Sequence, residues 1–345
     1  VNGGDESYYH PFSLPQGYSD VNLSDFWFPY RDRVSFAQAV CPQVQVCEQH
    51  FAPKQISTPD YAYTLNYGYH LDALKFARLL QRHAVERLAV NHLTDHIVKV
   101  NSRPDGDIAS VTGKVHGDIE GDLFIDCSGF ISLLLGKHYS VPFIDRKDIL
   151  FNDRALAVQV PYADQNDPIA SATLSTAQRA GWIWDIGLPT RRGTGHVYSS
   201  QYTSEEQARD DLQAYLVATS PGVKVDELPV RLIEIRPGYR ETFWHKNCVA
   251  IGLAGGFLEP LEASALVLVE VGARMLAENM PNNRQVMDIV ARKFNEKFLF
   301  RWKQVIAFLK LHYVLTRRTD SQYWLDHCKP EHIPERLQEL LTLWQ

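Results

Sequence analysis

A strand, a glycine-rich turn and an apolar helix follow one another in the segment 247–277, which constrains the fold more than any other. Residues 247–253 form a short apolar run bounded by turn residues, as in a buried strand. Ala-Gly-Gly follows, and the apolar spacing over 263–277 predicts a long helix. Small residues at such a turn let the backbone approach a ligand, and the free amides of a helix start stabilise anions. The segment therefore favours an α/β fold with a ligand at the turn, unless the glycines serve only close helix–strand packing.

The composition limits the classes of partner that the chain can have. Of its 345 residues, 45% are hydrophobic and 11% aromatic, which is ample for a packed core. The formal net charge of -6 provides no basic surface, so we expect neither nucleic acid nor a membrane as a partner. No apolar run reaches the roughly 18 residues of a spanning helix, and the polar, aromatic start is unlike a signal peptide. These features favour a soluble, cytoplasmic protein.

The spacing of cysteines and histidines gives no sign of a metal site. The five cysteines are scattered and form no C-x-x-C pair, so we expect neither a disulfide framework nor a zinc site. The histidines also lack the short spacing typical of metal ligands. Those expected to be ordinary surface or core residues include His92, His96, His116 and His196.

Changes in the hydrophobic period divide the chain into helical and extended segments. Residues 1–60 are rich in Tyr, Phe, Pro and Ser without periodicity, which indicates irregular loops packed on a core. The regular segments predicted after them are a helix over 70–87, a β-meander over 95–129, a mixed sheet with one helix over 150–245, and helices over 286–315 and 334–344.

Two glutamates, Glu259 and Glu262, stand three residues apart at the predicted start of the long helix. Glu262 is expected just inside the helix, where it can reach into a pocket, whereas Glu259 precedes Pro260 and is expected to face the turn. Carboxylates at a helix start are commonly capping residues, so the pair by itself has a structural explanation. However, the string Phe-Leu-Glu-Pro-Leu-Glu at 257–262, followed by small residues and an apolar helix, resembles the signature of flavin-dependent tryptophan halogenases. In that family the second glutamate stands at the substrate, and the next few residues bind halide beside the flavin.

Further segments resemble parts of the same family, in the same order along the chain. Gly-Trp-Ile-Trp-Asp-Ile at 181–186 is similar to its W-x-W-x-I-P element, with Gly187 in place of proline. Two Trp residues on one face of a strand would otherwise be simple core residues. Residues 122–129 resemble the second flavin-fold motif, and 318–324 resemble a late helical region. Tyr-Tyr-His-Pro-Phe at 8–12 resembles the segment whose His and Phe sandwich an indole ring.

The resemblance covers essentially the whole chain and implies a mixed α/β fold. This is an FAD-binding, flavoprotein-monooxygenase-like fold with a mixed-sheet substrate domain and a helical C-terminal part. The strands of 95–129 and 247–253 are then expected to share one sheet. The regions implied are an aromatic loop region lining the substrate pocket (1–60), two parts of the FAD-binding domain (61–150 and 246–282), the mixed-sheet substrate domain (151–245) and a helical region (283–345).

The activity that the resemblance implies is that of an oxidoreductase, an FAD-dependent halogenase that chlorinates or brominates tryptophan, another indole or a related small aromatic substrate. Reduced FAD, delivered by a separate flavin reductase, would react with oxygen and convert chloride or bromide to hypohalous acid. Glu262 would act beside the arene as a base or as a hydrogen-bonding group that stabilises developing positive charge. The other residues implied are His10 and Phe12 for the substrate, Ser264 and Ala265 for halide, Leu253 and Leu266 at the isoalloxazine, and Ile97 at the adenine end.

Some features of the family are missing or altered. The sequence holds no G-x-G-x-x-G fingerprint for the FAD pyrophosphate, and the family's halogen-delivering lysine would belong to a section before Val1. We therefore expect the 345 residues of this sequence to be an internal section of a longer gene product. Ala263 and Ala265 replace the usual Ser and Gly, which leaves the identity of the substrate open. Two alternative functions are open, a flavin-dependent aromatic monooxygenase and a non-catalytic remnant that binds flavin or an aromatic molecule. A homodimer is compatible with each of these functions.

Overall fold

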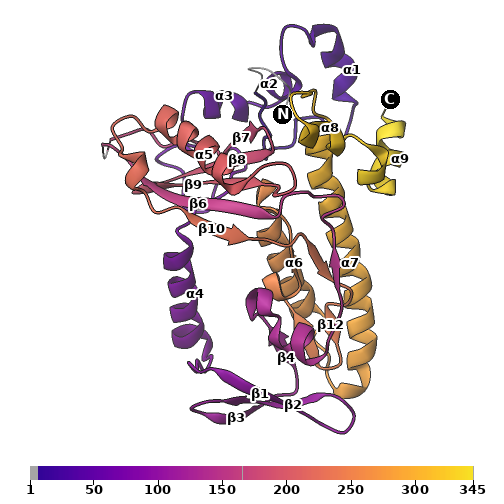
Figure 1. The fold of residues 1–345 in the computed structure, drawn as a ribbon. Coiled ribbons are helices and arrows are strands. Elements are labelled where there is room, and N and C mark those ends of the chain that lie inside the picture. Colours follow the sequence, from indigo (N-terminus) through magenta and orange to yellow (C-terminus); the bar gives the residue numbers. More distant parts are fainter. Residues whose placement is uncertain (1–6, 165, 345) are drawn as a thin grey trace.

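A long helix, α7 (Arg284–Val314), runs along most of the molecule and connects its parts (Figure 1). The structure is a computed structural model that describes residues 7–164 and 166–344. A five-stranded sheet lies toward one end of α7, and a small three-stranded sheet lies at the other end (Figure 1). None of the helices in the described ranges combines the length and the apolarity needed to cross a bilayer.

The five-stranded sheet is antiparallel throughout, so the prediction of a mixed sheet over 151–245 is wrong in this respect. Two residues join β8 to β9, and a connection that short permits only antiparallel pairing. Helix α5 (Glu205–Thr219) packs its buried residues Ala208, Leu212 and Leu216 against the sheet. In spatial order the strands are β10 (Arg231–Glu234), β6 (Arg154–Pro161), β9 (Arg191–Tyr198), β8 (Gly181–Leu188) and β7 (Leu174–Gln178).

The strands of 95–129 divide between two sheets. Strand β4 (Phe124–Asp126) runs parallel to β13 (Cys248–Ala250), which also pairs with β12 (Trp244–His245), so part of the predicted common sheet is confirmed. The rest of that prediction is wrong, because β1 (Ile97–Ser102), β2 (Ile108–Gly113) and β3 (Gly117–Glu120) form a separate antiparallel sheet. The side chain of Asn247 joins the two sheets, because its amide pairs with both backbone groups of Ile108 at 2.8 Å.

A third small sheet places the glycine-rich turn against the core. It consists of β14 (Gly256–Phe257), β11 (Gly238–Arg240) and β5 (Phe143–Asp145), all antiparallel. Gly256 has φ +156°, and a Cβ there would lie 2.5 Å from the Gly238 carbonyl oxygen and 2.7 Å from the Tyr239 Cα. Close packing of strand β14 on strand β11 therefore explains this glycine, and not the helix–strand packing that the sequence suggested as the alternative.

The C-terminal part is helical, as predicted. Helix α6 (Ser264–Glu278) packs on α7, and the short helices α8 (Gln322–His327) and α9 (Glu335–Leu343) follow. Asn283 begins α7 because its side chain accepts a hydrogen bond from the Val286 amide. The core between α7 and the sheets is rich in aromatic rings, among them Phe243, Trp244, Phe294, Phe298 and Trp302.

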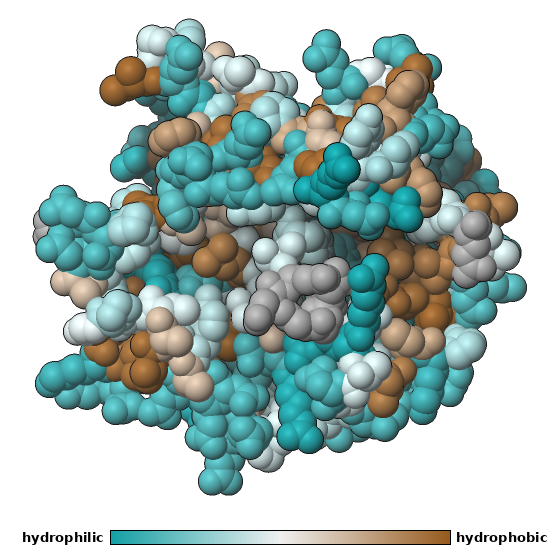
Figure 2. All heavy atoms as spheres, turned by 90° about the horizontal axis from the view of Figure 1, so that it is seen from above, coloured by the Kyte–Doolittle hydropathy of each residue, from teal (hydrophilic) through white to brown (hydrophobic). Residues whose placement is uncertain are grey.

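The N-terminal region is less irregular than predicted. It contains the short helices α1 (Leu23–Trp27), α2 (Phe36–Val40) and α3 (Gln43–Glu48), and Ser35 with Gln38 forms a capping box that begins α2. Figure 2 views this end of the molecule and shows hydrophobic patches among hydrophilic ones. The following helix, α4 (Ala73–Leu88), stands apart in Figure 1, and none of its residues is buried by the described chain.

Replacing Gly256 by Ala should destabilise the fold by about 2–4 kcal/mol, because the added methyl group meets backbone atoms that cannot move independently. The matched control is Gly193→Ala in β9, where an added Cβ meets no atom within 4 Å. Urea unfolding of both variants measures the difference. Equal stabilities for the two variants would contradict this account of the turn.

Candidate active site

The turn between β14 and α6 presents Glu262 by means of an unusual backbone. Glu262 (φ 59°, ψ 21°) and Ala263 (φ 51°, ψ 23°) are both left-handed, which costs about 1–2 kcal/mol for each residue that is not glycine. Buried Leu261 and Ser264 flank this left-handed pair on both sides. Such strain persists only where the surrounding structure enforces it, and it commonly marks a functional site.

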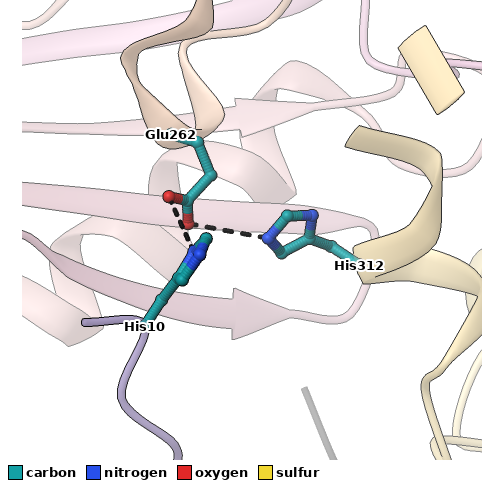
Figure 3. Close-up of side chains that lie close together, drawn as sticks. All are labelled: His10, Glu262 and His312. Carbon is teal, nitrogen blue, oxygen red and sulfur yellow. Dashed lines mark ion pairs between the residues drawn. The ribbon is translucent and has the colours of Figure 1, made fainter. Parts of the chain in front are cut away.

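The position of Glu262 corrects two interpretations of the sequence. The residue lies in the 3-10 turn η6 (Leu261–Ala263) before α6, and not inside the helix as expected. No side-chain hydrogen bond caps the start of α6, because its N-cap is Ala263. The carboxylate is therefore not a helix cap, and it points toward His10 and His312 (Figure 3).

Glu259 has a different environment from Glu262 and does not face the turn, contrary to the prediction. Its side chain is only 1% exposed. The oxygen Oε2 accepts hydrogen bonds from Asn152 Nδ2 (2.7 Å), Trp182 Nε1 (2.9 Å) and the Tyr313 hydroxyl (2.6 Å). Burial of a carboxylate is costly unless such donors surround it. Trp182, the first Trp of the W-x-W element, is thus a core residue that also holds Glu259 in place.

A second layer of buried polar groups supports these donors. The Tyr323 hydroxyl donates to Asn152 Oδ1 at 3.1 Å, and burial raises the pKa of both Tyr313 and Tyr323 well above the usual value. Lys310 is fully buried, and its ammonium group contacts the Ile149 carbonyl (3.2 Å) and His327 Nδ1 (2.8 Å). Burial lowers the pKa of Lys310 to about 7. Helix α7 therefore contributes two buried polar residues, Lys310 and Tyr313, to the region directly behind the turn.

Two imidazoles flank the carboxylate of Glu262. His10 Nδ1 lies 2.9 Å from Oε2, and His312 Nε2 lies 3.6 Å from Oε1 (Figure 3). Burial opposes ionisation of Glu262, but the interactions with His10 and His312 prevail and lower its pKa to about 2. The hydrogen bond to Glu262 in turn raises the pKa of His10, against the opposing effect of burial. The site therefore holds a carboxylate that stays ionised at neutral pH.

His312 is the site residue that the sequence analysis missed. It comes from α7, some fifty positions after Glu262, and no spacing rule connects a helix interior to a distant turn. His10 was predicted and does contact Glu262. Phe12 is 64% exposed, with its ring beside Gly68 and its amide hydrogen-bonded to Gln43 Oε1. The structure thus brings His10, but not the ring of Phe12, against the carboxylate.

An exposed apolar surface lies on the side of the glycine-rich turn where a flavin ring is expected. Leu253 and Leu266 are exposed, as are Phe130 and Ile131 of the neighbouring turn η2 (Gly129–Ile131). The Ser132 hydroxyl ties the two turns together by donating to the Ala254 carbonyl at 2.9 Å. These side chains are therefore available to contact a flat aromatic cofactor. Ile97 is half-buried in β1, in the separate sheet.

The residues expected to bind halide lie at the start of α6. Ser264 is buried, and its hydroxyl donates to the Leu261 carbonyl at 3.1 Å. Its backbone amide also donates to that carbonyl, so it is not free for an anion. The next amides, beginning with Ala265, have no intrahelical partner by helix geometry and remain suited to an anion.

Comparison with known proteins identifies the family. The model of the family described as "Tryptophan halogenase" matches residues 2–345. The chain belongs to the tryptophan halogenase family. It is 31% identical to "Tryptophan 7-halogenase RebH" of Lentzea aerocolonigenes, covering 100% of this chain and 64% of that protein. It is 32% identical to "Tryptophan 6-halogenase SttH" of Streptomyces toxytricini, covering 98% and 67%.

Solved structures confirm the fold of this family member. The crystal structure of a tryptophan halogenase from Shewanella frigidimarina NCIMB 400 superposes with a TM-score of 0.95 at 50% identity, covering 100% of this chain and 65% of that one. The predicted family and the mixed α/β fold are therefore confirmed. The chain spans about two thirds of the length of these relatives.

Replacing Ala263 by Gly should stabilise this halogenase-family protein by about 0.5–1 kcal/mol, because relief of the left-handed strain exceeds the added backbone entropy of glycine. Ala265→Gly, two residues along in the first turn of α6, is the control and should destabilise by about 0.5–1 kcal/mol. Melting temperatures measure both changes. If Ala263→Gly lowers the melting temperature as much as Ala265→Gly, the backbone of the turn is not strained.

Proposed function

We propose that this chain carries the substrate site of a flavin-dependent halogenase that chlorinates or brominates tryptophan, another indole or a related aromatic molecule. The observation that carries the proposal is the ionised carboxylate of Glu262, held on a strained turn beside His10 in a chain of this family. Relatives named as tryptophan 6- and 7-halogenases support an indole as the substrate class. The proposed localisation is the cytoplasm.

FAD is the cofactor that the apolar surface at the glycine-rich turn would hold. Leu253 and Leu266 would border its ring system, and the backbone of Ile97 would lie toward the adenine. When bound in reduced form, supplied by a separate flavin reductase, FAD provides the reducing equivalents with which oxygen converts halide to hypohalous acid. The halide would bind at the first turn of α6, near Ser264 and Ala265, where helix amides favour an anion.

Glu262 would act on the substrate. When a ring carbon of the indole forms its bond to the electrophilic halogen, hypohalous acid loses that halogen and leaves as hydroxide or water, and the ring becomes positively charged. The carboxylate of Glu262, whose lowered pKa keeps it ionised at neutral pH, stabilises that charge. Its oxygen then takes the proton from the halogenated carbon, so that the ring regains its aromaticity. Even a weak base suffices here, because a protonated arene is a much stronger acid than a carboxylic acid.

His10 and Phe12 would position the flat ring of the substrate. His10 already contacts Glu262, and the exposed ring of Phe12 lies two residues further along the same loop. Stacking of an indole between aromatic faces gives orientation as well as affinity. Entry of the substrate would then replace the direct contact between His10 and Glu262.

Glu262→Gln should lower the yield of halogenated product on the order of 10²-fold, because the amide neither carries the charge nor accepts the proton. FAD affinity should stay nearly unchanged. The assay supplies the full-length protein with FAD, flavin reductase, NADH, oxygen, bromide or chloride and L-tryptophan, and measures products by mass spectrometry. Glu259→Gln is the matched control, since it should act mainly by lowering the melting temperature.

Two outcomes of that assay would overturn the proposal. If Glu262→Gln retains full halogenation of tryptophan, other indoles and phenols, the role assigned to Glu262 is wrong. If the wild-type protein yields an oxygenated product at a rate independent of halide, the activity is that of an aromatic monooxygenase.

A further inference from the structure

We propose that His10, Glu262 and His312 form a binding site for one divalent transition-metal ion, with Zn²⁺ as the preferred occupant. The site goes beyond the proposed function, which requires no metal. Because the ion would occupy the carboxylate that faces the arene, it would exclude the substrate. The site is therefore inhibitory, and its occupancy would depend on the free Zn²⁺ concentration.

The three donor atoms already lie close to the arrangement that a metal ion needs. One ligand atom of each residue lies within 4.8 Å of the others, with individual separations of 2.9 Å (His10 Nδ1 to Glu262 Oε2) and 3.6 Å (His312 Nε2 to Glu262 Oε1). Ligands at about 2.0–2.1 Å from a tetrahedral Zn²⁺ stand roughly 3.3 Å apart. The two histidine-to-carboxylate separations, each to a different oxygen of Glu262, bracket that distance. Because the ligand atoms of all three residues lie within 4.8 Å of one another, the side chains would draw closer together around a bound ion.

The hydrogen bonding of His312 fixes which ring nitrogen is available. Its Nδ1 lies 3.0 Å from the carbonyl oxygen of Phe308, which can only accept, so Nδ1 carries the proton. In the neutral ring, Nε2 then presents a lone pair, and this lone pair faces an oxygen of Glu262. Either a proton on Nε2 or a metal cation can lie between this nitrogen and the carboxylate, and a metal ion would take the place of that proton. A histidine that binds a metal through one ring nitrogen usually donates the N–H of the other ring nitrogen to a carboxylate, a backbone carbonyl or water. The hydrogen bond from His312 Nδ1 to Phe308 is of this kind.

The donor set selects the class of metal. Two imidazoles and one carboxylate favour Zn²⁺ and its neighbours over Mg²⁺ and Ca²⁺, which prefer oxygen ligands. The side chains are exposed to different degrees, 46% for His10, 24% for Glu262 and 11% for His312, so the cluster is open on the His10 side. Solvent can therefore supply a fourth ligand, as in three-ligand zinc sites.

The ligands come from three segments that are distant in sequence. His10 belongs to the N-terminal loop, Glu262 to the strained turn and His312 to α7 (Figure 3). Within residues 7–164 and 166–344, no second group of three such donors converges in this way. The pair His116 and Asp95 has the same 2.9 Å contact but lacks a third donor, which makes it an internal control.

Titration with ZnCl₂ in a buffer that does not chelate metals, followed by calorimetry, tests the proposal on the full-length protein without flavin. The wild type should bind one Zn²⁺, and Co²⁺ in its place should give the visible absorption of a tetrahedral site. His312→Gln and Glu262→Gln should each weaken Zn²⁺ binding by about 100-fold or more, since loss even of outer-sphere partners costs 10–100-fold. His116→Gln should leave the affinity unchanged.

A second variant separates loss of a ligand from damage to the fold. His312→Cys replaces one zinc ligand by another and should retain Zn²⁺ binding, whereas His312→Gln should not, with similar melting temperatures for both. L-Tryptophan should compete with Zn²⁺ in the wild type. Equal Zn²⁺ affinity in the wild type, Glu262→Gln and His312→Gln, or the absence of saturable binding to the wild type, would overturn the proposal, and neither result depends on halogenation.

Discussion

The hydrogen bonds to the buried carboxylate of Glu259 hold together the parts of the molecule that make the site. Its Oε2 accepts from Trp182 in β8, from Asn152 just before β6, and from Tyr313 in α7. The five-stranded sheet, the long helix and the turn are thereby joined at one atom. Removal of one partner from a buried ionic group typically costs about 3–5 kcal/mol, because the remaining charge keeps its desolvation penalty. The other oxygen, Oε1, has no hydrogen-bond partner among the described residues, so all the hydrogen bonds of this carboxylate converge on Oε2.

The geometry of Glu262 follows from this anchor. Only Pro260 and Leu261 separate the two glutamates, and Leu261 is itself buried, so the chain must reverse within a very short distance before α6 begins. The left-handed backbone of Glu262 and Ala263 accomplishes the reversal and directs the second carboxylate away from the core. Helix α7 supports both carboxylates with adjacent residues, since Tyr313 donates to Glu259 and His312 faces Glu262. A shift of α7 would therefore disturb the anchor and the reactive carboxylate together.

The sequence predicts those features of the fold and site that depend on local sequence patterns. The long helices α6 and α7, strand β8 and the importance of Glu262 follow from hydrophobic period and from the family signature. The antiparallel order of the large sheet could not be read in this way, because strand direction depends on connections and tertiary packing. The role of Glu259 was misjudged for a similar reason. Its hydrogen-bond donors, Trp182, Asn152 and Tyr313, lie 77 and 107 positions before it and 54 after it. Contacts between residues so distant in the chain produce no periodic pattern in the sequence. His312 was missed because an isolated histidine on an aromatic-rich helix has no local signal for its partner.

A double-mutant cycle between Glu259 and Tyr313 tests most directly whether their hydrogen bond anchors the turn to α7. The unfolding free energies of the wild type, Glu259→Gln, Tyr313→Phe and the double variant would be measured in urea. We expect a coupling energy of about 1–3 kcal/mol, as for buried residues that share one hydrogen-bond network. Effects that add to within about 0.3–0.5 kcal/mol would show that the two residues act independently, and would contradict the account of Glu259 as the anchor of the site.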